Sequence, residues 1–164
     1  MKQLFLVKVT YTKQLDNGKF KRVVEPYLFD GHTFTDCEAN VYEHLGRGRH
    51  PDVEFNIIKM DKFNVDNIIF DNEEVFDKFF LVRQEFIGLD DNLIKEKVLV
   101  NATSIVNAEL LVTQHSEGWS NSNPEVKSIV ETKILEYFKS EITKNEQEET
   151  DRFFSSKLNA KDEE

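Results

Sequence analysis

The feature that most constrains the fold of this chain is a repeat within its own sequence. Four short blocks of the first half reappear in the same order 71 to 75 residues later. Residues 5–11 match residues 80–86, and residues 51–53 match residues 124–126. Between them, two further blocks match in the same way: 28–30 with 99–101, and 34–38 with 105–109. One such match arises by chance, whereas four in a fixed order indicate an internal duplication.

The first copy has the pattern of two strands, a helix and a third strand. Asn17-Gly18 separates two β-rich runs and is the strongest short signal for a hairpin, because both turn positions favour positive φ. Pro26 cannot donate to a ladder, which predicts an edge or a bulge in the return strand. The expected strands cover residues 4–12, 19–29 and 53–60.

Residues 35–38 have the pattern of a capping box, with Thr35 accepting from a free amide while Glu38 reaches back. This pattern predicts a helix from Thr35 to about Leu45, ended by Gly46. In the second copy the helix is expected near residues 104–114, and its cap is weakened because Val106 stands where the first copy has Thr35. The strands of the second copy are expected over residues 79–87, 94–100 and 126–135.

The predicted fold is therefore α+β, with two diverged β-β-α-β repeats. A two-stranded hairpin with one helix is marginal alone, so the copies should pack as one pseudo-twofold unit of antiparallel-rich sheet with helices on one face. The first repeat is assigned to residues 1–70, the second to 71–140, and a charged tail, for which a short helix is one alternative, to 141–164.

Several of these motifs resemble an uncharacterised domain-of-unknown-function family of Bacteroidetes, their mobile elements and their crAss-like phages. The resemblance covers roughly residues 3–138 and rests on Tyr11, 16–18, 25–28, 34–39 and 131–134. This family has no established catalytic residues. Its occurrence in phages and mobile elements implies a role in the replication or transfer of DNA. The chain departs from the family by its longer charged tail after Phe138.

No catalytic or cofactor motif is found in the sequence. The four histidines do not form a pair at metal-ligand spacing such as i, i+4. Residues 46–50 contain two glycines but lack the lysine and hydroxyl of a phosphate-binding loop. The expectation is a non-enzymatic protein without cofactor or metal.

The composition favours a cytoplasmic protein. No apolar run reaches about 18 residues, the length needed to span a membrane. Lys8 interrupts the apolar stretch at the N-terminus, whereas a signal peptide has an uninterrupted apolar core. A single cysteine, Cys37, suits a reducing compartment. Net charge is −10, yet residues 1–70 carry ten basic and ten acidic side chains, so the first half is the better candidate for binding phosphates.

Basic and aromatic residues in the first copy suggest a surface for single-stranded DNA, which needs cations along the phosphates and aromatic faces under the bases. The alternative is that the cations merely solvate a strand and the aromatics form core. The acidic balance of residues 71–140 also counts against binding. The candidate residues are Tyr11, Lys19, Phe20, Lys21, Arg22, Arg47, Arg49 and Trp119.

The tail contains Phe153 and Phe154 among charged residues that cannot bury them locally. They are candidates for recruiting a replication or other phage protein, while packing back onto the chain's own domain is an equal alternative. Two functions thus remain open. One is a single-stranded DNA-binding protein in phage or mobile-element replication. The other is a protein-interaction protein, such as a phage adaptor, inhibitor or virion component, that binds no nucleic acid.

Overall fold

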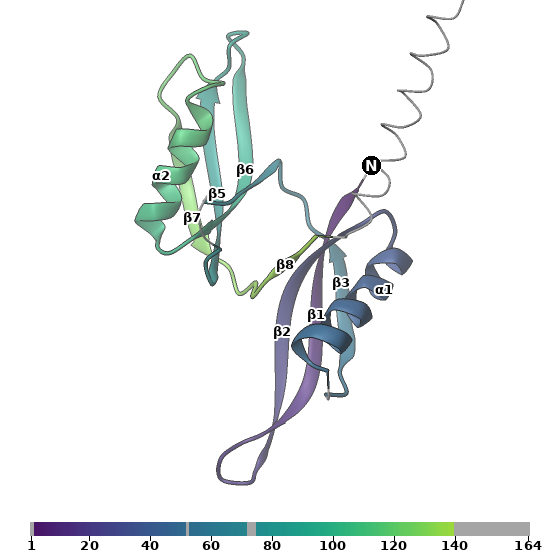
Figure 1. The fold of residues 1–164 in the computed structure, drawn as a ribbon. Coiled ribbons are helices and arrows are strands. Elements are labelled where there is room, and N and C mark those ends of the chain that lie inside the picture. The colour runs from purple at the N-terminus through teal and green to yellow at the C-terminus, as the bar shows by residue number, and fades with distance from the viewer. Residues whose placement is uncertain (1, 52, 72–74, 140–164) are drawn as a thin grey trace, which may run out of the picture.

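The computed structural model describes residues 2–51, 53–71 and 75–139, apart from the side chain of Arg49. Two four-stranded sheets, each accompanied by one helix, form an α+β fold (Figure 1). The elements in chain order are β1 (Gln3–Gln14), β2 (Phe20–Gly31), α1 (Phe34–His44), the π-helical turn η1 (Leu45–Arg49), β3 (Asn56–Lys62), β4 (Asn67–Ile69), β5 (Lys78–Ile87), β6 (Leu93–Ala102), α2 (Ile105–Ser116), β7 (Glu125–Glu131) and β8 (Tyr137–Phe138).

Both halves of the chain build the same unit. A hairpin is followed by a helix, and a third strand returns to pair antiparallel with the first strand of the hairpin. The register of that third strand shifts after Lys8 in the first unit and after Arg83, the matching residue, in the second. Bulges are preserved within families, so a bulge at the same position in both units supports descent from one ancestor. The predicted β-β-α-β topology is confirmed for both copies.

Two short strands outside this plan join the units. β4 follows the first unit but lies parallel to β6, and β8 follows the second unit but lies parallel to β2. Equivalent hydrogen bonds hold the two crossings: the amide of Asp66 donates to the carbonyl of Lys97 (2.8 Å), and that of Leu135 to the carbonyl of Pro26 (3.0 Å). Each sheet is therefore completed by a strand from the other unit.

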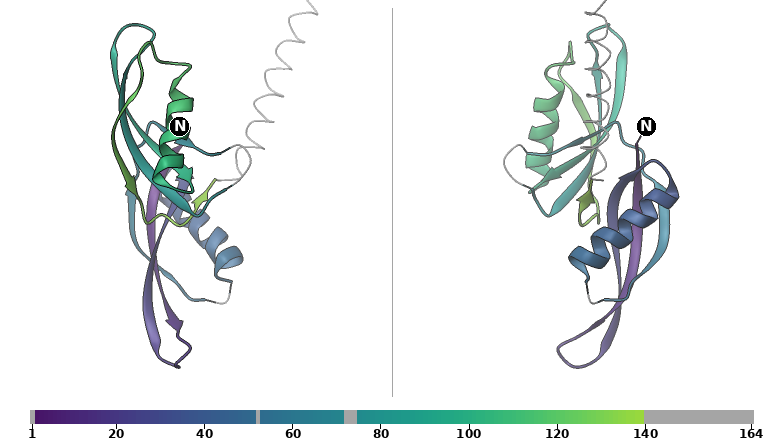
Figure 2. Two further views of the ribbon diagram at one scale, coloured as in Figure 1. Left: turned by 90° about the vertical axis from the view of Figure 1, so that its left-hand side faces the viewer. Right: turned by 45° about the vertical axis from the view of Figure 1, so that its right-hand side comes forward.

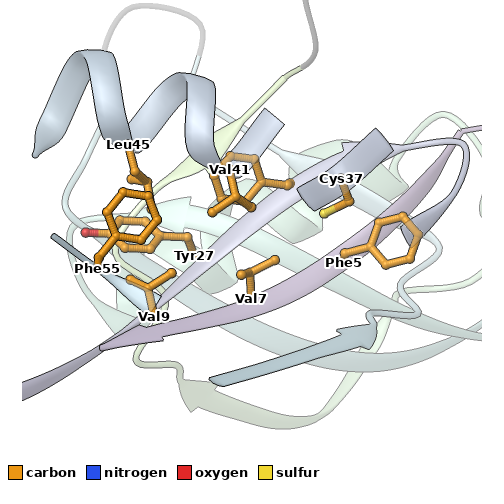
Figure 3. Close-up of a cluster of buried hydrophobic side chains, with 9 residues drawn as sticks. Phe5, Val7, Val9, Tyr27, Cys37, Val41, Leu45 and Phe55 are labelled. Carbon is orange, nitrogen blue, oxygen red and sulfur yellow. The ribbon is translucent and has the colours of Figure 1, made fainter. Parts of the chain in front are cut away.

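Three hydrophobic clusters follow from strand alternation, because successive residues face opposite sides of a sheet. On β1, Phe5, Val7 and Val9 face α1 and form the first core with Tyr27, Cys37, Val41, Leu45 and Phe55 (Figure 3). A matching cluster lies under α2 around Val82, Val98 and Val112. The third cluster joins the units and contains Leu28, Phe79, Leu99 and Ile134. The two hairpins point to opposite ends of the molecule (Figures 1 and 2).

The helix caps differ from the expectation. Thr33, not Thr35, caps α1: its Oγ1 accepts from the amide of Asp36 (3.1 Å). Phe34 already belongs to the first turn, where its ring packs against Phe5 at a centroid distance of 4.9 Å. In the second unit Ser104, the residue matching Thr33, caps α2 in the same way. The predicted capping box is thus two residues too late, and the cap predicted to be weakened is intact.

The end of α1 also differs from the expectation, because Gly46 does not stop the helix. The chain continues into η1, and the amide of His50 donates to the carbonyl of Leu45 (2.7 Å). Leu45 is fully buried in the first core, so its packing stabilises this wider turn. Among the described helices, none has the length and apolar character needed to cross a membrane.

Candidate nucleic-acid interface

The β1–β2 hairpin holds five of the residues proposed to bind DNA, and four of them, Lys19 to Arg22, lie at its turn and the start of β2. Its turn lies where predicted, but only Gly18 has the positive φ (+79°) that was expected of both turn residues; Asn17 Oδ1 instead accepts from the amide of Lys19 (3.0 Å). Lys13 pairs with Lys21 and Thr12 with Arg22 across the hairpin. Because neighbouring residues face opposite sides, Phe20 and Arg22 lie on the sheet face away from α1, whereas Lys21 lies on the other. The four residues do not form one surface.

Phe20 and Arg22 remain together on the open face of the first sheet. The Phe20 ring is 72% exposed, and Arg22 Nε donates to Thr10 Oγ1 (3.0 Å). Lys8 and Lys59 pair across β1 and β3 on the same face. Arg22 is two residues from the exposed Phe20 ring, whereas Lys8 lies opposite Pro26, farther along β2, and Lys59 Nζ lies 3.2 Å from Asp61. An aromatic ring beside a cation suits a single strand.

The other proposed binding residues are placed elsewhere. Arg47 Nη1 lies 3.7 Å from Glu43 on the exposed side of α1. Trp119 follows α2 in the second unit, beside the bridge between Gly88 and Ser120, and its indole donates to the carbonyl of His115 (2.6 Å). Trp119 is 57% exposed and belongs to the second unit, whereas Phe20 begins β2 at the turn of the hairpin in the first. The side chain of Arg49 and residues Phe153 and Phe154 lie outside the described part of the chain.

Tyr11 belongs to a buried polar cluster around Glu25. Its hydroxyl donates to Glu25 Oε1 (2.7 Å), that of Tyr27 donates to Oε2, and His50 Nε2 lies 3.1 Å from Oε2. Burial alone would raise the pKa of Glu25, but the hydrogen bonds from Tyr27, Tyr11 and His50 outweigh it and lower the pKa below its usual value. The Tyr11 ring packs against the His50 ring at 4.6 Å. Tyr11 is thus held in this cluster through both its hydroxyl and its ring, and its position is structural.

A different basic surface lies where the first unit meets the open face of the second sheet. Two hollows of about 650 and 400 Å³ share Lys97 as a lining residue. We call them together the cationic groove, because six cationic residues line it against three carboxylates, Asp66, Glu85 and Glu96. The cations are Lys2, Lys62, Arg83, Lys95, Lys97 and Lys127.

The centre of the cationic groove brings like charges together. Arg83 and Lys97 are direct cross-strand partners on β5 and β6, and like charges at such positions repel. Lys95 and Lys127 have Glu85 within 3.9 and 3.7 Å. Among the described residues, no ion pair is formed by Lys62, Arg83 or Lys97. These three cations are available to an anionic ligand.

The duplication supplies an internal comparison for the groove. The same crossing occurs on the other side of the pseudo-twofold axis, at a place we call the twin junction. At the twin junction, the positions equivalent to Lys2, Lys62 and Lys97 are occupied by Asp77, Glu131 and Pro26, respectively. The matching backbone hydrogen bonds form in both places, Phe63 to Leu4 and Thr132 to Phe79, each 2.8 Å. The fold of the crossing therefore does not require Lys2, Lys62 or Lys97, and the presence of these three lysines on one side calls for a functional explanation.

The cationic groove could not be predicted from local sequence patterns because its residues come from both copies. Charge counts over whole segments made residues 71–140 look unfavourable for phosphates, although Arg83, Lys95, Lys97 and Lys127 all lie there. A signal was present in the repeat itself. When the alignment of the two copies is extended, the lysines at positions 2, 62 and 97 align with two acidic residues and a proline of the other copy.

The described residues hold no group of three or more His, Cys, Asp or Glu side chains arranged to bind a metal ion. The molecule is thus an α+β protein of two duplicated, strand-exchanged units with a basic groove at one junction. The chain belongs to a family described as a domain of unknown function, DUF4494, whose profile matches residues 3–140. No curated protein and no solved structure matches it.

Proposed function

We propose that this protein is a non-enzymatic binder of single-stranded DNA, and that the cationic groove holds the phosphate backbone. The observation that carries the proposal is the difference between the groove and the twin junction, which share a backbone but differ in charge at the three positions where the groove has Lys2, Lys62 and Lys97. A site with uncompensated cations attracts phosphates and releases their counterions on binding.

Two aromatic residues supply the second element of single-strand recognition. Phe63 lines the larger hollow of the groove, and Phe20 stands exposed on the open face of the first sheet. Stacking of a base on such a ring contributes about 1–3 kcal/mol and tolerates any sequence. The resemblance to proteins of Bacteroidetes phages and mobile elements supports a role in DNA replication, in the cytoplasm.

Titration of labelled oligonucleotides of about 20–40 nucleotides at two salt concentrations tests this function. The expected result is binding that weakens steeply as the salt concentration rises and that shows little sequence preference. Duplex DNA should be a poor competitor of the labelled single strand. Replacing Lys19, Lys21 and Arg22 by Ala tests the hairpin in the same assay. Absence of binding at low salt, where attraction is strongest, contradicts the proposal.

A protein-interaction function is the second candidate, and α2 carries the observation in its favour. Ile105, Val106 and Leu110 expose 53%, 77% and 54% of their surface. Val106 and Leu110 are four residues apart and so lie on one side of the helix. If no oligonucleotide binds, this stripe becomes the surface to test against protein partners, and Phe153 and Phe154 the tail residues to test with it.

A further inference from the structure

We propose that residues 141–151 bind within the cationic groove and compete there with nucleic acid. The proposal rests on the proposed function for the identity of the competitor, and on charge for the contact itself. This segment contains one lysine and five carboxylates, at positions 141, 146, 148, 149 and 151. It is the most acidic stretch of the tail, since residues 152–164 carry three basic and three acidic side chains.

The point at which the tail leaves the described chain lies beside the groove. Lys139 lines a hollow together with Lys2, Gln3 and Leu4, and the same three residues line the larger hollow of the groove. Eleven extended residues span roughly 36 Å, at about 3.3 Å each. A segment of this length is long enough to extend from Lys139 into the groove.

The charges at the centre of the groove suit carboxylates as well as phosphates. Arg83 and Lys97 face each other across the strands, and an anion between them relieves their repulsion. The twin junction has Asp77 and Glu131 where the groove has Lys2 and Lys62, and its Glu131 is already paired with Lys78 (3.7 Å), so it attracts an acidic segment less than the groove does. Charge thus favours the cationic groove over the twin junction for residues 141–151.

Occupancy of the groove by the tail lowers the apparent affinity for nucleic acid by the fraction of molecules whose groove is free. A tail bound in most molecules, and released when its charge is removed, changes the apparent affinity by about 3- to 10-fold. High salt screens the tail and the nucleic acid alike, so the effect belongs to low salt.

Two full-length variants with equal changes in net charge separate this contact from a general charge effect. Glu146→Gln, Glu148→Gln and Glu149→Gln together should tighten oligonucleotide binding about 3- to 10-fold at low salt, and leave it unchanged at high salt. Asp162→Asn, Glu163→Gln and Glu164→Gln form the matched control and should have less than about a twofold effect. Equal effects of both triple variants contradict docking in the groove.

A second measurement needs no nucleic acid. A nitroxide attached at Asn145→Cys should broaden the amide signals of Arg83 and Lys97 more than those of Lys78 and Lys133, and high salt should abolish the effect. The native Cys37 is buried and does not compete for the label. The proposal is wrong if none of these amide signals broadens. It is also wrong if broadening arises only between different molecules, one labelled and one isotope-enriched, because the contact is then intermolecular. If broadening occurs but neither the unaltered protein nor the Glu146, Glu148 and Glu149 triple variant binds oligonucleotides, the proposed function is wrong while docking of the tail is still supported.

Discussion

Glu25 and Glu96 occupy matching positions on β2 and β6, and 15% of each side chain is exposed. Glu25 is surrounded by two tyrosine hydroxyls and His50, whereas Glu96 accepts from Gln84 Nε2 (2.7 Å) and has His115 at 3.9 Å. Both units thus bury a carboxylate between the hairpin and the end of the helix, and each satisfies it with different partners. Burial of such a group is costly without these hydrogen bonds.

The lowered pKa of Glu25 makes a prediction about pH. A carboxylate whose pKa is lower in the folded than in the unfolded state stabilises the fold above the unfolded pKa, and this contribution is lost as pH falls through the folded pKa. The free energy of unfolding should therefore fall less steeply below about pH 4.5 in Glu25→Gln than in the unaltered protein.

Denaturant titrations at pH 7 and at several pH values below 4.5 measure this difference. Tyr11→Phe removes one donor to Glu25 and should give an intermediate dependence. Identical pH profiles for all three proteins would show that the cluster around Glu25 does not hold the charged carboxylate.

The helix caps predict a difference between two neighbouring threonines. Thr33→Ala should lower the free energy of unfolding by about 1 kcal/mol, the usual loss of an N-cap. Thr35→Ala should change it by less than about 0.5 kcal/mol, because Thr35 is exposed within the first turn. Denaturant midpoints measure both, and a larger loss at Thr35 would restore the capping box expected from the sequence.

At the level of elements, the exchanged strands β4 and β8 hold the two units together. Phe138 of β8 stacks on Phe29 (4.9 Å) and on His44 (5.3 Å), so a residue that follows the second unit packs against the core of the first. These strands have three and two residues, too few for any alternation to be visible. Their partners lie far away in sequence, which is why local patterns did not predict them.

Phe138→Ala should therefore destabilise the protein although its residue lies outside both β-β-α-β units. The expected loss is about 2–3 kcal/mol, less than for a fully buried ring, since Phe138 is only partly buried. Phe20→Ala is the matched control, with an expected change below about 0.5 kcal/mol because that ring is exposed. Equal losses in the two variants would argue against a structural role for the β8 crossing.

At the scale of the whole molecule, the duplication was the part of the structure most accessible from sequence. Hydrophobic alternation placed Phe5 and Phe80 on matching strands, and Asn17-Gly18 placed the first turn. What the sequence left open was how the units face each other, because that depends on the third cluster around Leu28 and Leu99. The candidate site followed the same division: single motifs marked the hairpin, while the cationic groove required residues from both units.

At the two crossings, the units differ in the charge of their side chains but keep the same backbone hydrogen bonds. Matching crossings keep the same hydrogen bonds, but one carries Lys62 and Lys97 where the other carries Glu131 and Pro26. The account of this protein as a nucleic-acid binder depends on that difference.

The most direct test compares the salt dependence of oligonucleotide binding in two double variants. Lys62→Gln with Lys97→Gln removes two cations from the groove, and Lys78→Gln with Lys133→Gln removes two around the twin junction. The account predicts that the slope of log affinity against log salt becomes shallower by roughly 1.4 in the groove variant, at about 0.7 for each lost phosphate contact, and is unchanged in the other. Equal slopes in both variants, or no binding by the unaltered protein, would contradict it.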